Sequence, residues 1–223
     1  MSLILNIETA TKNCSVCISK DGEIIALKEI NDGNYSHAEK LHELIKQAVS
    51  EAKIELSYLN AVAVSKGPGS YTGLRIGVSA AKGLCFALDI PLISVNTLQS
   101  LALSVSISEG YKIPLLDARR MEVYSQVFNN KTEKIREVCA EIITPESFSD
   151  YLNNRKVYFF GDGAEKCKEI IAHKNAIFID AKFPSAKDMV EISFEKFRKN
   201  NFEDLAYFEP FYLKEFLGGI SKK

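Results

Sequence analysis

The chain has 223 residues, of which 46% are hydrophobic and 26% charged, and its formal net charge is −1. The length allows one large domain or two small ones, and the hydrophobic fraction is sufficient for an ordinary core. The near-neutral charge excludes a general electrostatic attraction to nucleic acid, so contact with RNA would need a local patch or a basic partner.

The first residues predict a cytoplasmic protein. Met1 and Ser2 lead directly into an apolar stretch, with no basic segment and no cleavage-site pattern. The cysteines form an odd set, which we expect to be reduced thiols: Cys14, Cys17, Cys85, Cys139 and Cys167. The most apolar predicted helix, at 72–88, is too charged and too rich in glycine for a membrane span. We therefore expect no membrane contact.

Residues 1–108 predict an antiparallel meander of three strands followed by alternating helices and strands. A hairpin turn at Asp21-Gly22 joins the second and third strands. Ser36 and Glu39 predict a capping box for the first helix, and Thr72 and Thr97 are the expected caps of the next two. The expected strands lie at 3–11, 14–19, 23–30, 61–64 and 91–95, and the expected helices at 37–52, 72–88 and 97–104.

Residues 109–223 repeat this order without obvious sequence identity. The expected strands lie at 113–117, 122–128, 133–139, 157–160 and 176–179, and the helices begin near Thr144, at 164 and at a Ser185 cap. The last of these is a closing helix at 185–200, whose placement the sequence leaves open. The pattern predicts an α/β protein of two related halves, each with a mixed sheet flanked by helices, packed together without a linker.

The predicted helix at 72–88 indicates an interface. Arg75 and Lys82 are its only charged residues, so the helix must be covered on nearly all sides. Small residues at every fourth position would allow another backbone to approach closely. The first helix carries an apolar stripe at helical spacing. We expect a partner to contact Leu41, Leu44, Ile45, Ala48, Gly73, Arg75, Gly77, Val78 and Ala81.

The glycine loop before this helix suits an anion, because a helix N-terminus presents unpaired N–H groups. A plain strand-to-helix corner is the alternative, since neither GxGxxG nor GxxxxGK[ST] is present. Glu8 and Asp117 each end the first strand of their half, where paired acids could hold Mg²⁺ and a nucleotide or simply bond nearby N–H groups. The sequence therefore predicts at most a vestigial nucleotide or phosphate site at Glu8, Thr9, Gly67, Gly69, Asp117, Gly161, Asp162 and Gly163.

We predict no metal site. His37 and His42 are five residues apart, about 140° around a helix, so they cannot share one ligand face. Cys14 and Cys17 match CxxC but lie in a predicted strand, where their side chains point to opposite faces. Arg119 and Arg120 are the only two consecutive arginines in the sequence. They could bind a phosphate or a partner carboxylate, or simply lie in solvent at the end of a strand.

Several segments together resemble one family. The stretch from Lys66 to Gly77 (KGPGSYTGLRIG) is similar to the signature of the bacterial tRNA threonylcarbamoyladenosine biosynthesis protein TsaB, also called YeaZ. The stretch from Asp117 to Tyr124 (DARRMEVY) resembles the same family's second-half motif, and 4–11 and 212–214 resemble its ends. The resemblance covers nearly the whole chain.

This resemblance implies an actin/Hsp70-like (ASKHA, ribonuclease H-like) fold. It implies a non-catalytic partner that binds and activates the catalytic paralogue TsaD, with TsaE as the associated ATPase and no required cofactor. The same helical face would form homodimers in isolation, and tRNA would be met through the complex. Glu8 departs from the aspartate of many members, and the metal histidines of the catalytic paralogue have no match here.

Two alternatives remain open from the sequence. One is an active ATP-dependent small-molecule kinase of the same fold, which would need a cleft acid holding Mg²⁺. The other is a redox or metal protein that uses Cys14 and Cys17.

Overall fold

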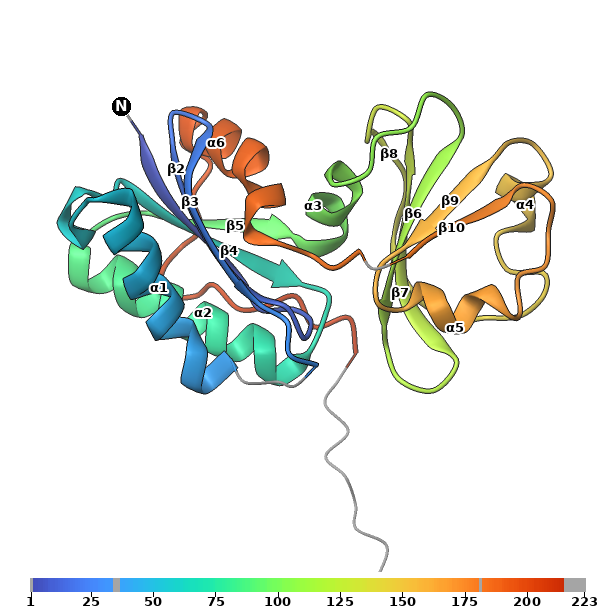
Figure 1. Cartoon of the computed structure of the whole chain (residues 1–223), viewed down its shortest axis with the longest axis horizontal. Coiled ribbons are helices and arrows are strands. Elements are labelled where there is room, and N and C mark those ends of the chain that lie inside the picture. The colour runs from blue at the N-terminus through green and yellow to red at the C-terminus, as the bar shows by residue number, and fades with distance from the viewer. Residues whose placement is uncertain (1, 34–36, 181, 215–223) are drawn as a thin grey trace, which may run out of the picture.

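The computed structural model describes residues 2–33, 37–180 and 182–214, which form two lobes on separate five-stranded sheets (Figure 1). The first sheet has the order β3-β2-β1-β4-β5 and the second the order β10-β9-β6-β7-β8. In each sheet the first three strands are antiparallel, and the other two run parallel to the first. The predicted pair of related α/β halves is therefore confirmed.

The strands lie close to the predicted ranges. The first sheet contains β1 (Leu3–Glu8), β2 (Cys14–Lys20), β3 (Glu23–Ile30), β4 (Ala61–Gly67) and β5 (Leu92–Asn96). The second contains β6 (Tyr111–Asp117), β7 (Glu122–Asn129), β8 (Lys134–Ile142), β9 (Val157–Phe160) and β10 (Ala176–Ile179). In the first sheet Leu5 lies opposite Ile18 on one side and Val62 on the other, which aligns the buried positions of three strands.

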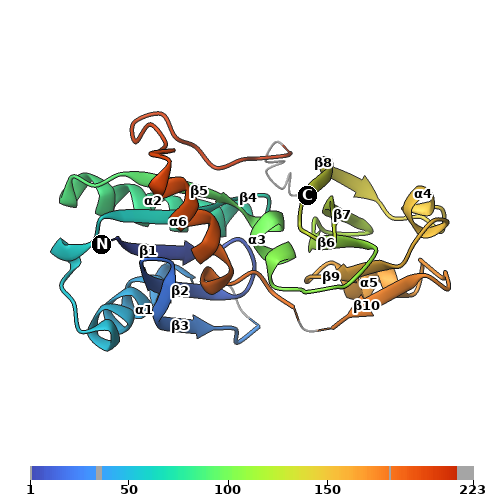
Figure 2. The same cartoon turned by 90° about the horizontal axis from the view of Figure 1, so that it is seen from above.

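Helices cover both faces of the first sheet. α1 (His37–Ala52) and α2 (Tyr71–Leu88) pack on the face that carries Leu5 and Ile7, whereas Ile4 points to the opposite face. The short 3-10 helix Leu56–Tyr58 follows α1. α3 (Thr97–Leu103) lies between the lobes (Figure 2), and its Leu101 packs with Phe128 and Phe160 of the second sheet. The other face of the second sheet carries the short helices α4 (Ser149–Leu152) and α5 (Ala164–Lys168).

The closing helix packs on the first sheet. It consists of a 3-10 turn, Ala186–Met189, followed by α6 (Val190–Arg198). The buried side chains of Ala186, Met189 and Val190 contact Ile4 and Ile93. The first lobe is thus completed by the end of the chain, while the boundary near residue 108 stays a prediction.

The caps of α2 and α3 differ from the sequence prediction, because a neighbouring side chain accepts the capping hydrogen bond. Ser70, not Thr72, accepts a hydrogen bond from Gly73 N at 3.2 Å, so α2 begins at Tyr71. Asn96 caps α3 in the same way, through Gln99 N at 2.9 Å. The helix expected from Thr144 starts at Ser149, and α5 ends at Lys168 instead of near residue 173. The expected Ser36 cap lies outside the described residues.

If the closing helix stabilises the first lobe, truncating its central side chain should cost stability. Met189 is fully buried, so we expect Met189→Ala to lower the free energy of unfolding by about 2–4 kcal/mol. The matched control is Met121→Ala, at a methionine that is 37% exposed, and should change it by less than about 0.5 kcal/mol. Urea unfolding measures both, and equal effects would show that α6 is only loosely attached.

Candidate functional site

The glycine loop is occupied by the chain's own β1–β2 turn. A side-chain carbon at Gly69 would lie 2.5 Å from the carbonyl oxygen of Ala10, and Ser70 N donates to that oxygen at 2.7 Å. Gly67 has a φ of +106°, which favours glycine, and its missing side chain leaves room for the backbone of Phe211. The loop glycines therefore serve close packing of the chain on itself.

The small-residue face of α2 points into its own lobe, which corrects the expected partner contacts there. A side-chain carbon at Gly73 would collide with the carbonyl oxygen of Thr9, and one at Gly77 with the Thr9 hydroxyl. Ala81 is fully buried, and Val78 nearly so. The close approach that the spacing predicted does occur, but the approaching backbone is the turn after β1.

The apolar stripe of α1 is also internal. Leu41 and Ala48 are fully buried, and Leu44 and Ile45 are at most 5% exposed, all in the core between α1 and the first sheet. These four side chains face the sheet and are therefore unavailable to a partner. The apolar stripe is regular because it is the side of α1 that packs on the sheet. Of the nine predicted partner residues, Arg75 alone is exposed.

Glu8 is fully buried at the end of β1, next to β4 and the β1–β2 turn. Its Oε1 accepts a hydrogen bond from Ala10 N at 2.7 Å, whereas its Oε2 has no hydrogen-bond partner among the described residues. Burial raises the pKa of this carboxyl to about 7, although the hydrogen bond from Ala10 N opposes the rise. A fully buried carboxyl group with a pKa near 7 is a poor ligand for Mg²⁺, because Mg²⁺ binds ionised carboxylates.

A cavity of about 360 Å³ lies between the lobes, and it receives only part of the predicted nucleotide site. Asp117, Gly161 and Asp162 line it, whereas Glu8, Thr9, Gly67, Gly69 and Gly163 do not. Lys12, Asn31 and Lys182 face it from elsewhere along the chain, as do Phe178 and Phe183. Side-chain carbons at Gly161 and Gly163 would press on the backbone of β6, so these glycines too serve internal packing.

The acids of this cavity are held by the protein's own groups. Lys166 forms an ion pair with Asp117 and donates to the carbonyl oxygens of Arg120 at 2.8 Å and Glu122 at 2.6 Å. Asp162 accepts from Asp117 N at 3.1 Å, and burial raises its pKa to about 6. Within the described residues, no group of three or more His, Cys, Asp or Glu side chains is arranged to hold a metal ion. The residues present therefore do not fit a bound Mg²⁺.

His37 and the CxxC pair are structural. His37 Nε2 lies 2.7 Å from the carbonyl oxygen of Thr11 and is buried between α1 and the β1–β2 turn, whereas His42 is exposed. Cys14 and Cys17 point to opposite faces of β2 as predicted, and each is a free thiol. Burial raises the pKa of both thiols to about 12, so they are poor nucleophiles and the redox alternative has no support.

The surface that α1 and α2 present to solvent is a shallow groove of about 550 Å³. It is lined by Ala38, His42, Arg75, Ile76, Ser79, Ala80, Gly83 and Leu84. Ile76, Ala80 and Leu84 are half-buried at spacings of four, in a row beside the small residues of α2, where they pack partly against the core. The sequence prediction missed this row, although its i, i+4 spacing was the signal that could have found it. None of the helices in the described ranges has the length and apolar character to cross a membrane.

Comparison with known proteins decides the family. A family model described as "TsaD: tRNA N6-adenosine threonylcarbamoyltransferase" matches residues 32–216. The tRNA threonylcarbamoyladenosine biosynthesis protein TsaB of Buchnera aphidicola subsp. Schizaphis graminum is 31% identical over 87% of this chain and 94% of its own. The chain belongs to the TsaB family, within the wider family of that model. TsaB of Haemophilus influenzae is 28% identical over 95% of this chain and 93% of its own.

The fold agrees with this family. The structure of YeaZ from Pseudomonas aeruginosa superposes with a TM-score of 0.78 at 24% identity, covering 96% of this chain and all of that one. The actin-like fold with two related halves is therefore confirmed. As a TsaB-family member, the chain takes part in tRNA threonylcarbamoyladenosine biosynthesis, alongside TsaD.

The contact between α2 and the β1–β2 turn can be tested with two glycines of one helix. We expect Gly73→Ala to lower the free energy of unfolding by about 1–3 kcal/mol, because the new methyl group would overlap the Thr9 backbone. Gly83→Ala is the control, since nothing lies within 4 Å of that position and alanine favours the helix by up to about 1 kcal/mol. Urea unfolding of both variants should give opposite signs, and two losses of equal size would contradict the packing.

Glu8 should make stability depend on pH in an unusual direction. Its folded-state pKa is raised from 4.5 to about 7, so its favourable contribution is fully present below pH 4.5 and is lost as the pH rises to 7. We expect Glu8→Gln to flatten the pH dependence of unfolding across this window by on the order of 2–3 kcal/mol. Urea unfolding at pH 5 and pH 8 measures it, and parallel profiles for the two proteins would show that Glu8 is ionised in the fold.

Proposed function

We propose that this chain is a non-catalytic subunit of the complex that forms threonylcarbamoyladenosine beside the anticodon of tRNA, where it binds and activates a TsaD-like catalytic paralogue. The observation that carries the proposal is the outer face of α1 and α2. Ile76, Ala80 and Leu84 border an open groove there, and Gly83 leaves its floor without a side chain. A pair of helices from a partner would bury these apolar groups and fill the groove.

The chemistry of the cleft supports a non-catalytic role. The glycine loop is filled by the turn at Ala10, Glu8 is buried, and Asp117 is neutralised by Lys166. These features disfavour the alternative of an active kinase, which would need an open phosphate loop and an ionised acid for Mg²⁺. No required cofactor is part of the proposal, and any binding of ATP or ADP would be weak.

The groove also sets the expected partners. In isolation a second copy of the chain would cover the same groove, so homodimer and heterodimer would compete for it. A TsaE-like ATPase would join the assembled pair. Contact with tRNA would run through the complex, in keeping with the chain's net charge of −1.

The decisive experiment places a large charged group in the groove. We expect Ala80→Arg to weaken binding to the host's TsaD-like protein at least tenfold and to remove activation of threonylcarbamoyl transfer to tRNA, because the arginine would have to be buried without a partner. Asn153→Arg, at the exposed end of α4 on the other lobe, is the matched control and should bind normally.

The isolated chain provides the second half of this test. With tRNA and substrates, but without the TsaD-like protein, it should yield no modified nucleoside. Modification by the chain alone would contradict the non-catalytic role, and full activation by Ala80→Arg would contradict the assignment of the groove.

A further inference from the structure

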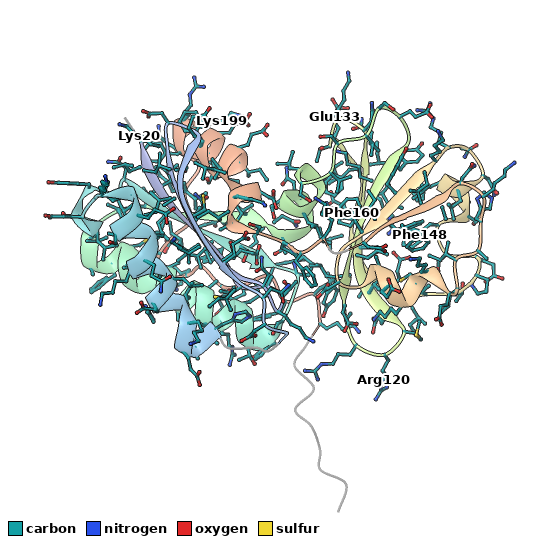
Figure 3. All side chains as sticks on the ribbon, viewed as in Figure 1. Lys20, Arg120, Glu133, Phe148, Phe160 and Lys199 are labelled. Carbon is teal, nitrogen blue, oxygen red and sulfur yellow. The ribbon has the colours of Figure 1, made fainter. Side chains whose placement is uncertain are left out.

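The turn between β6 and β7 carries Arg119 and Arg120 at the tip of a hairpin that projects from the second lobe (Figures 1 and 3). Both residues adopt left-handed backbone conformations, with φ of 70° and 52°. Asparagine and glycine adopt this conformation at much lower cost than arginine does. Two consecutive arginines are therefore a poor choice for the fold of this turn, which points to a role for their side chains.

Hydrogen bonds from neighbouring residues hold the backbone of the turn in place. Arg119 N donates to the Asp117 carboxylate at 3.0 Å, and Ala118 N donates to the carbonyl oxygen of Glu122 at 3.1 Å. Lys166 binds the carbonyl oxygens of Arg120 and Glu122 from α5. The two exposed arginine side chains are thus attached to an ordered backbone, which lowers the conformational entropy lost when they bind a ligand.

The charges around the turn are not balanced. Asp117 forms an ion pair with Lys166, and Glu122 forms one with Lys214. Across the described residues, neither the Arg119 nor the Arg120 guanidinium has a hydrogen-bond or ion-pair acceptor. Two arginines therefore remain available for anionic groups, in a geometry suited to carboxylates or phosphates.

Exposed apolar side chains lie beside the arginines. Met121 is 37% exposed and Ile142 is 68% exposed. Ile142 lies opposite Glu122, the neighbour of Met121 in the chain, and Ile143 N donates to the carbonyl oxygen of Met121 at 2.9 Å. Arginine and methionine are enriched in protein interfaces, and an apolar rim beside paired arginines suits a protein better than a nucleic-acid backbone. We propose that Arg119, Arg120, Met121 and Ile142 form a second docking surface, which binds a partner protein through closely spaced carboxylates flanked by apolar side chains.

This inference rests on the proposed function, because the probes are the host's TsaD-like and TsaE-like proteins, added in turn to the full chain. The test variant is Arg119→Asn/Arg120→Gly, which removes both guanidinium groups and relieves the backbone. We expect its unfolding midpoint to be unchanged or raised, while the Kd for one of the two proteins rises at least tenfold. The control, Arg155→Asn/Lys174→Asn, removes two exposed positive charges at the opposite end of the same sheet and should change neither Kd more than twofold.

The outcomes separate the two proposals. Failure of the unaltered chain to bind either protein would contradict the proposed function. Normal binding by the unaltered chain, with both Kd values of the Arg119→Asn/Arg120→Gly variant within twofold of it, would overturn this inference alone. So would a lowered unfolding midpoint, since the arginines would then serve the fold. Weakened binding of tRNA to the assembled complex, with both protein affinities kept, would also overturn it and assign the turn to RNA.

Discussion

The seating of α2 on the turn after β1 is the constraint on which the first lobe depends. Backbone meets backbone there: Ser70 N binds the Ala10 carbonyl oxygen, and Gly73 leaves space for the Thr9 carbonyl oxygen. A helix that uses its flat side in this way must turn its other side outward. The same contact closes the loop that could have held a phosphate and turns Arg75, Ser79 and Gly83 outward. The half-buried row Ile76, Ala80 and Leu84 lies between these two sides and borders the groove.

The two lobes are joined by segments far apart in the sequence. α3 packs on both sheets, and residues 201–214 run from the edge of β5 back past the glycine loop, where Phe211 N donates to the Lys66 carbonyl oxygen at 2.7 Å. Lys214 then pairs with Glu122 in the second lobe. The segment 201–214 also contacts α2, because Lys82 donates to the carbonyl oxygens of Ala206 and Phe208 and Arg75 donates to the Tyr212 hydroxyl. It therefore links the outer face of α2 to the hairpin of the second lobe.

The sequence was sufficient to predict the repeated fold, because short apolar runs bounded by turn residues indicate strands and apolar residues three and four positions apart indicate helices. It could not identify what covers each helical face. A glycine every four residues requires a close neighbour, but the spacing at Gly73 and Gly77 is the same whether that neighbour is a partner helix or the chain's own turn. The apolar stripe at Leu41 and Leu44 gave a wrong prediction of partner contacts for a related reason. The most regular apolar periodicity of a helix marks the side that packs in the core. Caps were missed by one or two residues where Ser70 and Asn96 competed with nearby threonines.

The surroundings of Glu8 and of the cavity acid Asp117 support the proposed non-catalytic role. A carboxylate that holds Mg²⁺ must be ionised, accessible and free of internal counter-ions. Glu8 is buried with a pKa near neutrality, and Asp117 is accessible but already paired with Lys166. Asp117 therefore stabilises the β6–β7 turn in place of a bound cation, whereas Glu8 is closed off from solvent. Because Asp117 and Asp162 are already bound by groups of the protein, the surfaces that remain open to a partner are the groove of α1 and α2 and the arginines of the hairpin. Another protein could cover both.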